Sequence, residues 1–280
     1  FIGKDNVPFH TVIFPALLMG QGDYILPDNV IGNEYLNVYN RATGKAEKGS
    51  KSKGNMISVQ WFVERFSRDA IRYYLCAIMP EGKDAAFDWD EFLNRYNGEL
   101  CDVVGNFAHR SLTMAVKNFD SKVPEPGTLD DEDRALLDSL PVQLDGVADS
   151  IENFRFRQAS ERLIDMGRRA NVYFDTKAPW TTRKTDLVRT ATTLYVCCQV
   201  VRALCTALAP FAPDGADKLA RILGVTLPKG GPNGGDDGWN AAKSGLPAGA
   251  PLQQPQVLFP KLDPDYVESL AAEHAAGKAT

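Results

Sequence analysis

Histidine and cysteine are scarce in this chain, and their spacing excludes the common metal and redox motifs. The 280 residues include three histidines and five cysteines, and no two cysteines form a Cys-x-x-Cys pair. A zinc knuckle needs such paired thiolates, so neither a zinc site nor a disulfide framework is indicated, and we expect no metal ligands. Cys197, Cys198 and Cys205 fall in an apolar stretch and are expected to be core residues, which fits a cytoplasmic compartment.

The chain also lacks a membrane signal and an excess of positive charge. No apolar run approaches the length of a membrane span, and the N-terminus does not resemble a signal peptide, so no membrane partner is expected. The formal net charge of −5 argues against a general nucleic-acid coat. The charge is unevenly placed, however, because residues 155–189 hold nine lysines and arginines against four acids, and such a basic face can guide a polyanion.

A short basic loop is the most informative feature that is present. Residues 48–52 read Lys-Gly-Ser-Lys-Ser, and residues 41–53 contain five basic side chains against one acid. Two lysines three apart, with glycine and serine around them, can close positive charge over a polyphosphate and stabilise a departing pyrophosphate. Alone this signal is modest, since small basic loops are also common solvated turns.

Hydrophobic spacing predicts a mixed first part and a helical second part. Residues 1–3 read as the end of a buried strand, so we expect either that the chain is a fragment or that the missing half of the sheet is supplied elsewhere. Tyr35, Leu36 and Val38 are candidates for a further strand, and residues 59–79 have a helical pattern.

After residue 90 the pattern is helix after helix. Asp130 is a plausible N-cap, Pro141 is expected to kink its helix or start a new one, and residues 187–208 are apolar enough for a central bundle helix. Residues 229–255 read as a glycine- and proline-rich linker, followed at 257–260 by an apolar segment expected to dock onto a folded surface. One helical stripe consists of Phe92, Tyr96, Leu100, Val103 and Phe107.

Several motifs follow one another along the chain: Phe1-Ile2-Gly3-Lys4-Asp5 with Phe9-His10 after it, the loop at 48–52, Asn106-Phe107-Ala108-His109-Arg110, Asn171 to Ala178-Pro179-Trp180, and Leu258-Phe259-Pro260-Lys261. In this order they resemble methionyl-tRNA synthetases, a family of class I aminoacyl-tRNA synthetases. Gly49 departs from the family, which has a large apolar residue there.

The resemblance implies an α/β part followed by an all-α part. Residues 1–80 are expected to form the distal half of a Rossmann-type class I catalytic domain. Residues 81–228 are expected to form an antiparallel helical bundle that binds the anticodon, and residues 229–280 a linker and C-terminal docking segment. The implied activity is methionine–tRNA ligase, which uses ATP with Mg²⁺, methionine and the methionine tRNA with anticodon CAU. No histidine stands in a His-x-Gly-His-type motif, so the N-terminal half of the catalytic domain is an expected partner and the isolated chain is expected to be inactive.

The resemblance also assigns roles to residues in the first part. Lys48 and Lys51 are the expected catalytic charges. His10 is expected in the methionine side-chain pocket, where aromatic and weakly polar walls suit a thioether. The expected ATP-binding residues are Gly3, Lys4, Asp5, Ser50, Lys51 and Ser52.

In the second part, an amide, a guanidinium and an indole together can read and stack unpaired bases. Two alternatives remain: a non-catalytic tRNA-binding or assembly module, and, less favoured by the anticodon residues, a synthetase for another aliphatic amino acid. A His-x-Gly-His-type motif upstream would decide between enzyme and module. The expected anticodon-binding residues are Asn106, Arg110, Asn171, Asp175 and Trp180.

Overall fold

The computed structural model describes residues 2–50, 54–227 and 238–277, and its contacts divide the chain into two units. The first unit comprises Phe1–Arg65, Ile78–Phe92 and Pro264–Thr280. The second comprises Phe66–Ala77 and Leu93–Asp263. The chain therefore leaves the first unit and returns to it twice, and the domain boundaries after residues 80 and 228 stay predictions.

Two small sheets organise the first unit. Strand β1 (Ile2–Gly3) pairs in parallel with β2 (Gly32–Asn33). In the other sheet β3 (Leu36–Asn40) lies between β4 (Lys45–Glu47), which is antiparallel, and β5 (Ala85–Phe87), which is parallel. Leu36 and Val38 lie in β3 and Tyr35 directly precedes it, so the predicted strand is confirmed.

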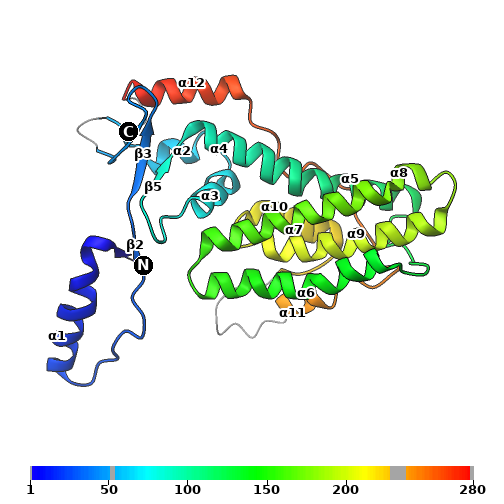
Figure 1. The fold of residues 1–280 in the computed structure, drawn as a ribbon, viewed down its shortest axis with the longest axis horizontal. Helices are drawn as coiled ribbons and strands as arrows, with labels where there is room; N and C mark the ends of the chain where they lie inside the picture. Colours follow the sequence, from blue (N-terminus) through cyan, green and yellow to red (C-terminus); the bar gives the residue numbers. More distant parts are fainter. Residues whose placement is uncertain (1, 51–53, 228–237, 278–280) are drawn as a thin grey trace. The chain divides into compact units, whose positions relative to one another are not determined.

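The segment between β1 and β2 is helical and exposes an apolar surface. It contains η1 (Lys4–Asn6), the π-helical η2 (Phe9–Ile13) and α1 (Phe14–Gln21), drawn in dark blue in Figure 1. Soluble chains rarely leave so many neighbouring apolar side chains in water unless another surface covers them. The exposed apolar residues are Phe9, Val12, Ile13, Phe14, Leu17 and Met19.

An aromatic cluster forms the core of the first unit, where α2 (Val59–Val63) packs near β5. Trp89 lies edge-on to Phe62 and Phe87, with ring centroids 6.0 Å and 4.9 Å away. Helix α12 (Pro264–Ala275) docks here, because the indole N–H of Trp89 donates to Nδ1 of His274 at 3.2 Å. Arg41 adds an ion pair to Glu268 at 2.6 Å.

The helix predicted for residues 59–79 is in fact two helices. Helix α2 ends at Val63 and α3 (Arg68–Ala77) begins after Ser67. The Ser67 hydroxyl accepts the Ala70 N–H at 3.2 Å, so this serine caps a new helix instead of continuing the old one. The apolar spacing continues across the break, which is why the pattern predicts one helix.

A long helical stretch begins at the end of the Ile78–Phe92 segment and continues through Leu93 into the second unit. Helix α4 (Trp89–Arg95) continues into the π-helical η3 (Tyr96–Gly105) and then α5 (Asn106–Asn118). The predicted stripe is confirmed at Phe92, Tyr96, Leu100 and Phe107, each at most 2% exposed, whereas Val103 is only half-buried.

The bundle is built on long helices that run side by side, as Figure 1 shows for α6 (Asp131–Glu152), α7 (Phe156–Lys177) and α9 (Leu187–Leu208). The short α8 (Pro179–Thr182) connects α7 to α9, and α10 (Pro213–Leu223) packs on α9. Asp130 is confirmed as the N-cap of α6, in a capping box with Asp133. Pro141 lies inside α6, so the alternative that it starts a new helix is wrong.

Helix α9 corrects one sequence prediction. By length and composition it is apolar enough to cross a membrane, with a mean hydropathy of 1.4 over its most apolar window, although no run was expected to approach that length. The fold buries 94% of that window, so α9 is the central helix of the bundle.

The predicted linker also contains structure. Helix α11 (Gly238–Lys243) packs against α9 and α6. The Gln199 side chain then accepts the Leu246 N–H at 2.6 Å and donates to the Leu246 carbonyl at 2.9 Å. The docking of the later apolar segment is confirmed, because Phe259 is 5% exposed, lies edge-on to Tyr96 and packs over the bare backbone of Gly215.

Candidate functional site

Lys4, predicted to bind ATP, lies in the first unit where β1 ends. Its ammonium pairs with Glu34 and, at 2.9 Å, with Asp84. The hydrogen bonds to Glu34 and Asp84 raise the pKa of Lys4, and the same bond from Lys4 lowers the pKa of Asp84. Gly3 ends β1 with open space where a Cβ would stand, so a ligand can approach the backbone there.

Tyr35 brings three of the predicted site residues together. Its ring lies 4.4 Å from Nζ of Lys4 and 4.7 Å from Nζ of Lys48, and its hydroxyl donates to the Asp5 carboxylate. That hydrogen bond to Asp5 raises the pKa of Tyr35. Both ammonium groups are at cation–π distance from one ring.

The sequence pattern marks Tyr35 only as a sheet residue and does not predict this role. Thirty positions separate it from Asp5, so no local spacing could have indicated the contact. The pairing of β1 with β2, which directly precedes Glu34 and Tyr35, is what brings the two segments together.

The base of the lysine loop is held by Asn55. Its side-chain oxygen accepts the Ser50 N–H at 2.7 Å, and its side-chain nitrogen donates to the Lys48 carbonyl at 3.4 Å. The loop motif does not predict this bridging position of Asn55. Lys51 and Ser52, the predicted catalytic and ATP-binding residues further along, lie outside the described residues.

His10 lies on η2 and is exposed within this chain. Its Nδ1 is 2.9 Å from the carbonyl oxygen of Asn6, one turn earlier. Neighbouring residues of η2 and α1 carry the exposed apolar surface described above, so the imidazole stands at the margin of an apolar patch. A pocket wall there requires a further surface to close it.

In the second unit, Arg110, Asp175 and Trp180 gather on one face of the bundle. The Arg110 guanidinium carbon lies 5.3 Å from the Trp180 ring, and an Arg110 nitrogen lies 3.5 Å from an Asp175 oxygen. Trp180 is 38% exposed, which leaves part of the indole open to a ligand. Cation, carboxylate and indole thus stand together at the surface, although they come from α5, α7 and α8.

Phe174 supports this face from below and was not predicted. It is fully buried, lies 5.6 Å from the Trp180 ring at 61°, and lies 4.8 Å under the Arg110 guanidinium. The buried Phe174 ring therefore contacts both the Arg110 guanidinium and the Trp180 indole and fixes their positions at the surface. Its apolar character alone marks it only as a core residue.

The two asparagines are placed differently. The Asn171 amide donates to the Val103 and Gly167 carbonyls at 2.9 Å and 2.8 Å, so its nitrogen is engaged in joining α7 to η3. Asn106 is exposed one turn before Arg110. It lines a pocket of about 350 Å³ together with His109 and the docked segment around Phe259.

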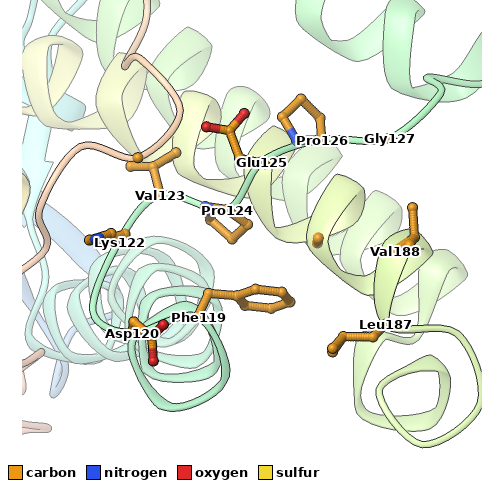
Figure 2. Close-up of a pocket in the computed structure, with 12 residues that line it drawn as sticks. Phe119, Asp120, Lys122, Val123, Pro124, Glu125, Pro126, Gly127, Leu187 and Val188 are labelled. Carbon is orange, nitrogen blue, oxygen red and sulfur yellow. The ribbon is translucent and has the colours of Figure 1, made fainter.

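A larger pocket, of about 530 Å³, lies elsewhere on the same unit. Figure 2 shows the Phe119 ring projecting between the loop that follows α5 and the first turn of α9 at Leu187 and Val188. Its rim carries Asp120, and none of the predicted site residues lines it. Among the described residues, moreover, no three His, Cys, Asp or Glu side chains lie close enough to hold a metal ion.

Two family models match successive parts of the chain. Residues 1–112 match the model of class I tRNA synthetases (M), and residues 123–279 match the model of the anticodon binding domain of methionyl tRNA ligase. The predicted order, a class I catalytic part followed by a helical anticodon domain, is confirmed.

Known proteins show the same similarity. The chain is 39% identical over 276 residues to the methionine–tRNA ligase of Pyrococcus abyssi, covering 95% of this chain and 36% of that protein. The Salinibacter ruber methionine–tRNA ligase is 38% identical over 282 residues, covering 96% of this chain and 39% of that protein. The chain thus spans less than half the length of these curated relatives.

Among solved structures, the Mycobacterium tuberculosis methionyl-tRNA synthetase in complex with methionyl-adenylate superposes with a TM-score of 0.82 at 34% identity. That match covers 92% of this chain and 49% of the solved one. The apo form of the M. tuberculosis enzyme gives a TM-score of 0.79 at 32% identity, covering 94% and 49%.

Proposed function

Because the chain belongs to the methionyl-tRNA synthetase family of class I synthetases, we propose that it is the part of a methionine–tRNA ligase that follows the phosphate-binding histidine motif. It carries the lysine loop and the anticodon-binding bundle, and it works in the cytoplasm. The observation that carries this proposal is the joint face of Arg110, Asp175 and Trp180, three chemically distinct groups drawn from three helices to one exposed surface.

The proposed reaction has two steps. A methionine carboxylate oxygen attacks the α-phosphorus of ATP in line, and the bond from that phosphorus to the bridging oxygen breaks. Methionyl-adenylate and pyrophosphate result. A ribose hydroxyl at the 3′ end of the tRNA then attacks the methionyl carbonyl, and AMP leaves. The first step needs positioning and positive charge more than acid–base groups.

The residues around Tyr35 are suited to that first step. Gly3 lets the nucleotide approach the backbone, and the Asp5 carboxylate holds a ribose hydroxyl or the substrate ammonium. Lys48 and Lys51, with Ser50 and Ser52 between and after them, supply charge to the departing pyrophosphate. The Lys48 ammonium lies 4.7 Å from the Tyr35 ring. This position supports the proposal, because the base of the lysine loop already faces the residues at the end of β1.

Lys4 is given a supporting part in this proposal. Its ammonium is already paired with Glu34 and Asp84, so it orders the strand end at which ATP binds. His10 lines the methionine side-chain pocket once a further surface closes over η2.

Magnesium is proposed to arrive with ATP and not to reside on this chain. Mg²⁺ keeps most of its waters and binds phosphate oxygens through few protein carboxylates, which fits a part of the chain whose described residues hold no three-ligand cluster. When bound it neutralises phosphate charge. The described carboxylates near the strand end, Glu34 and Asp84, are engaged with Lys4.

The N-terminal half of the catalytic domain is the proposed partner of the first unit. Helices η2 and α1 expose an apolar surface, on which Leu17 and Met19 are 67% and 68% exposed. Such a surface supports the proposal, because in soluble proteins an apolar patch of this kind is usually covered by another surface. That half can stand earlier in a longer protein or come from a second chain. We propose that the 280 residues alone form no methionyl-adenylate.

The anticodon face is proposed to read the CAU anticodon of the methionine tRNA. Trp180 stacks on one base, and Arg110 with Asn106 reads base edges. Asp175 orients Arg110, and Asn171 fixes α7 against η3 so that Asp175 and Trp180 keep their places.

Binding of an RNA anticodon stem-loop to the 280-residue chain tests this proposal. We expect the CAU stem-loop to bind more tightly than one with the anticodon replaced by GGC, by at least tenfold at equal salt, because one misread base costs about 1–3 kcal/mol. The same preparation should give no methionine-dependent ATP–pyrophosphate exchange until the N-terminal half is added. Equal affinity for the two stem-loops would refute the anticodon assignment, and exchange by the chain alone would refute its dependence on the other half.

A further inference from the structure

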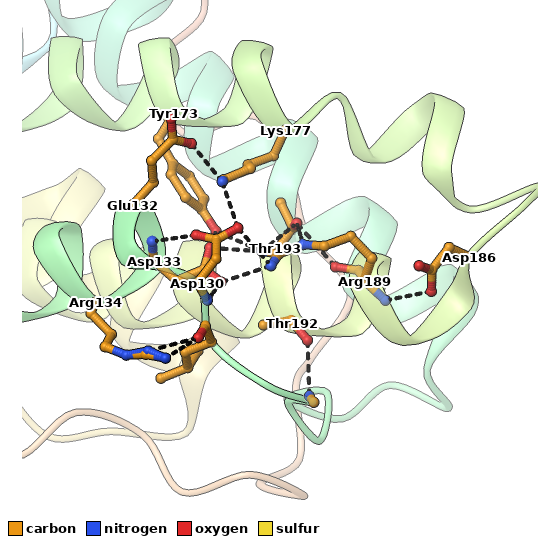
Figure 3. Close-up of polar contacts among 12 residues, drawn as sticks. Asp130, Glu132, Asp133, Arg134, Tyr173, Lys177, Asp186, Arg189, Thr192 and Thr193 are labelled. Atoms are coloured by element: carbon orange, nitrogen blue, oxygen red, sulfur yellow. Dashed lines mark hydrogen bonds and ion pairs between the residues drawn. The ribbon is translucent and has the colours of Figure 1, made fainter.

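An ionic cluster with a buried centre and an exposed rim joins three helix ends in the bundle, next to the proposed anticodon face. Figure 3 shows it between the start of α6, the end of α7 and the start of α9. We call it the corner cluster. Its members are Asp130, Glu132, Asp133, Tyr173, Lys177 and Arg189.

Asp133 is the centre of the corner cluster and its carboxylate is completely buried. Arg189 donates to both of its oxygens, at 2.8 Å and 2.7 Å, and the Tyr173 hydroxyl donates at 2.6 Å. The Asp130 N–H completes the set at 2.9 Å. A bidentate guanidinium contact fixes distance and orientation together, which a single ammonium cannot do.

The outer part of the corner cluster ties the end of α7 to the same point. Lys177 donates to Asp130 at 2.8 Å and also pairs with Glu132, and its side chain is only 13% exposed. Arg189 reaches Asp130 as well, at 3.1 Å. Burial opposes ionisation of Asp133, but the bonds from Arg189, Tyr173 and the Asp130 N–H outweigh it and lower its pKa, so the carboxylate stays charged.

The corner cluster holds both ends of the segment that carries Trp180. Lys177 is the last residue of α7 and Arg189 lies in the first turn of α9, so residues 178–188 are bracketed by two cluster members. Ala178 has φ = 42°, a left-handed conformation that costs energy in alanine and persists only if its surroundings impose it. The fixed ends therefore help to keep α8 in place, together with the contact of 2.7 Å between the Thr182 and Thr190 hydroxyls.

Helix α7 serves the corner cluster and the anticodon face at once. Tyr173 and Lys177, four residues apart, point toward the corner cluster, while Asp175 contacts Arg110. Phe174, between them, contacts both Arg110 and Trp180. A small rotation of α7 would therefore shift Asp175 and Phe174, and with them their contacts to Arg110 and Trp180.

We propose that the corner cluster is a positioning device for anticodon recognition: Asp133, Tyr173 and Arg189 act without touching RNA, by holding α8 so that Trp180 faces Arg110. This rests on the proposed function of the bundle. Preorganisation of this kind raises affinity, because the ordering of the face is not left to the binding step.

Tyr173→Phe is the cleanest test, since it removes one hydroxyl and leaves the ring. Tyr73→Phe is a matched control, because the hydroxyl of the buried Tyr73 also donates to a carboxylate, that of Glu99, at 2.6 Å in the same unit. Both variants should lower the thermal midpoint to a similar degree. Only Tyr173→Phe should weaken binding of the CAU stem-loop, by about 2- to 30-fold, the range seen for residues that act through others.

The salt dependence separates positioning from direct contact. Because neither Tyr173 nor Arg189 is proposed to touch phosphate, the slope of log Kd against log salt should be unchanged in Tyr173→Phe and in Arg189→Gln, which removes the positive charge. Removal of a side chain that binds a phosphate of single-stranded RNA would instead lower the slope by about 0.7 per contact. A lowered slope in Arg189→Gln would overturn the proposal in favour of direct RNA binding.

The two proposals fail differently. If the wild-type chain does not prefer the CAU stem-loop, the anticodon assignment falls. If it does prefer that stem-loop and Arg110→Ala weakens binding, but Tyr173→Phe and Tyr73→Phe bind equally to wild type, the corner cluster holds the fold alone and the positioning proposal is refuted. Equal weakening in both tyrosine variants also refutes it, because the effect then follows stability and not position.

Discussion

Replacement of Trp180 by alanine should weaken anticodon binding far more than it weakens the fold. The indole is 38% exposed and its inner edge rests on the buried Phe174 ring, so one part of it serves the bundle and another is available to a base. Stacking of one base on an aromatic side chain is worth about 1–3 kcal/mol. At 1.4 kcal/mol per factor of ten, Trp180→Ala should raise the Kd for a CAU stem-loop by about 5- to 150-fold.

The loss of RNA affinity in Trp180→Ala should overlap with the loss in Arg110→Ala, because the two side chains are in contact. The Arg110 guanidinium lies 5.3 Å from the Trp180 ring and 4.8 Å from the Phe174 ring, so it loses one of two aromatic contacts when the indole is removed. The effects of Trp180→Ala and Arg110→Ala should therefore not add, with a coupling of about 0.5–3 kcal/mol in a double-mutant cycle. Additive losses would mean that the two side chains act on RNA independently.

Fluorescence anisotropy of a labelled stem-loop, at fixed salt and well below the thermal midpoint, is the appropriate assay. Trp239→Ala is the matched control, because it makes the same truncation on α11, which packs on α9 and α6 away from the predicted anticodon residues. Its Kd should stay within about twofold of wild type, the expected result for a residue that carries no stacking energy. Equal weakening in both tryptophan variants would refute the stacking role.

Three further predictions concern the loop and two titrating groups. In the complete enzyme, Lys51→Ala should slow methionine-dependent ATP–pyrophosphate exchange by about 100- to 1,000-fold, because one preorganised charge contact is worth that much in a transition state. Near-normal exchange with unchanged tRNA binding would exclude Lys51 from the mechanism. Hydrogen bonds from Lys177 and the Asp133 N–H lower the pKa of Asp130 to about 2, so its contribution to stability is present above the ordinary value of 3.8 and is lost as pH falls toward 2. The slope of the unfolding free energy against pH in this window should therefore be smaller in Asp130→Asn. An unchanged slope would contradict this prediction. Burial lowers the pKa of His274 below 6.5, so the neutral ring is favoured in the folded chain and acidification from pH 7 to 5 should destabilise the docking of α12. Proteolysis of the C-terminal segment should therefore become faster over that pH range. The His274→Gln variant should show no such acceleration.

The sequence by itself determined the class of protein, the order of its two parts and most of the helices. Periodic apolar residues such as Tyr96, Leu100 and Phe107 predict a buried face because a helix repeats every 3.6 residues, and Asp130 indicates a helix start because its side chain can accept an unpaired N–H. These signals are local, and the structure follows them. The motifs that resemble a known family carried the functional assignment, since charge and composition alone left several classes open.

Where local patterning failed, a polar contact or distant packing overrode it. The apolar spacing of residues 59–79 runs through Ser67, but its hydroxyl caps α3 and breaks the helix. Pro141 stays inside α6 because only one N–H is lost while neighbouring helices pack along its length. Residues 238–243 form α11 inside a glycine-rich stretch because α9 and α6 offer a surface to pack against.

The sites depend most on tertiary structure, because their members are far apart in the chain. Tyr35 meets Asp5 across thirty positions through the β1–β2 pairing, and Phe174 reaches Arg110 across the bundle. Asp133 meets Arg189 only when the ends of α6 and α9 come together, and no spacing in the sequence encodes that distance. Local sequence sets which residues can form a helix or carry a charge; the packing of helices and the pairing of strands decide which of them meet.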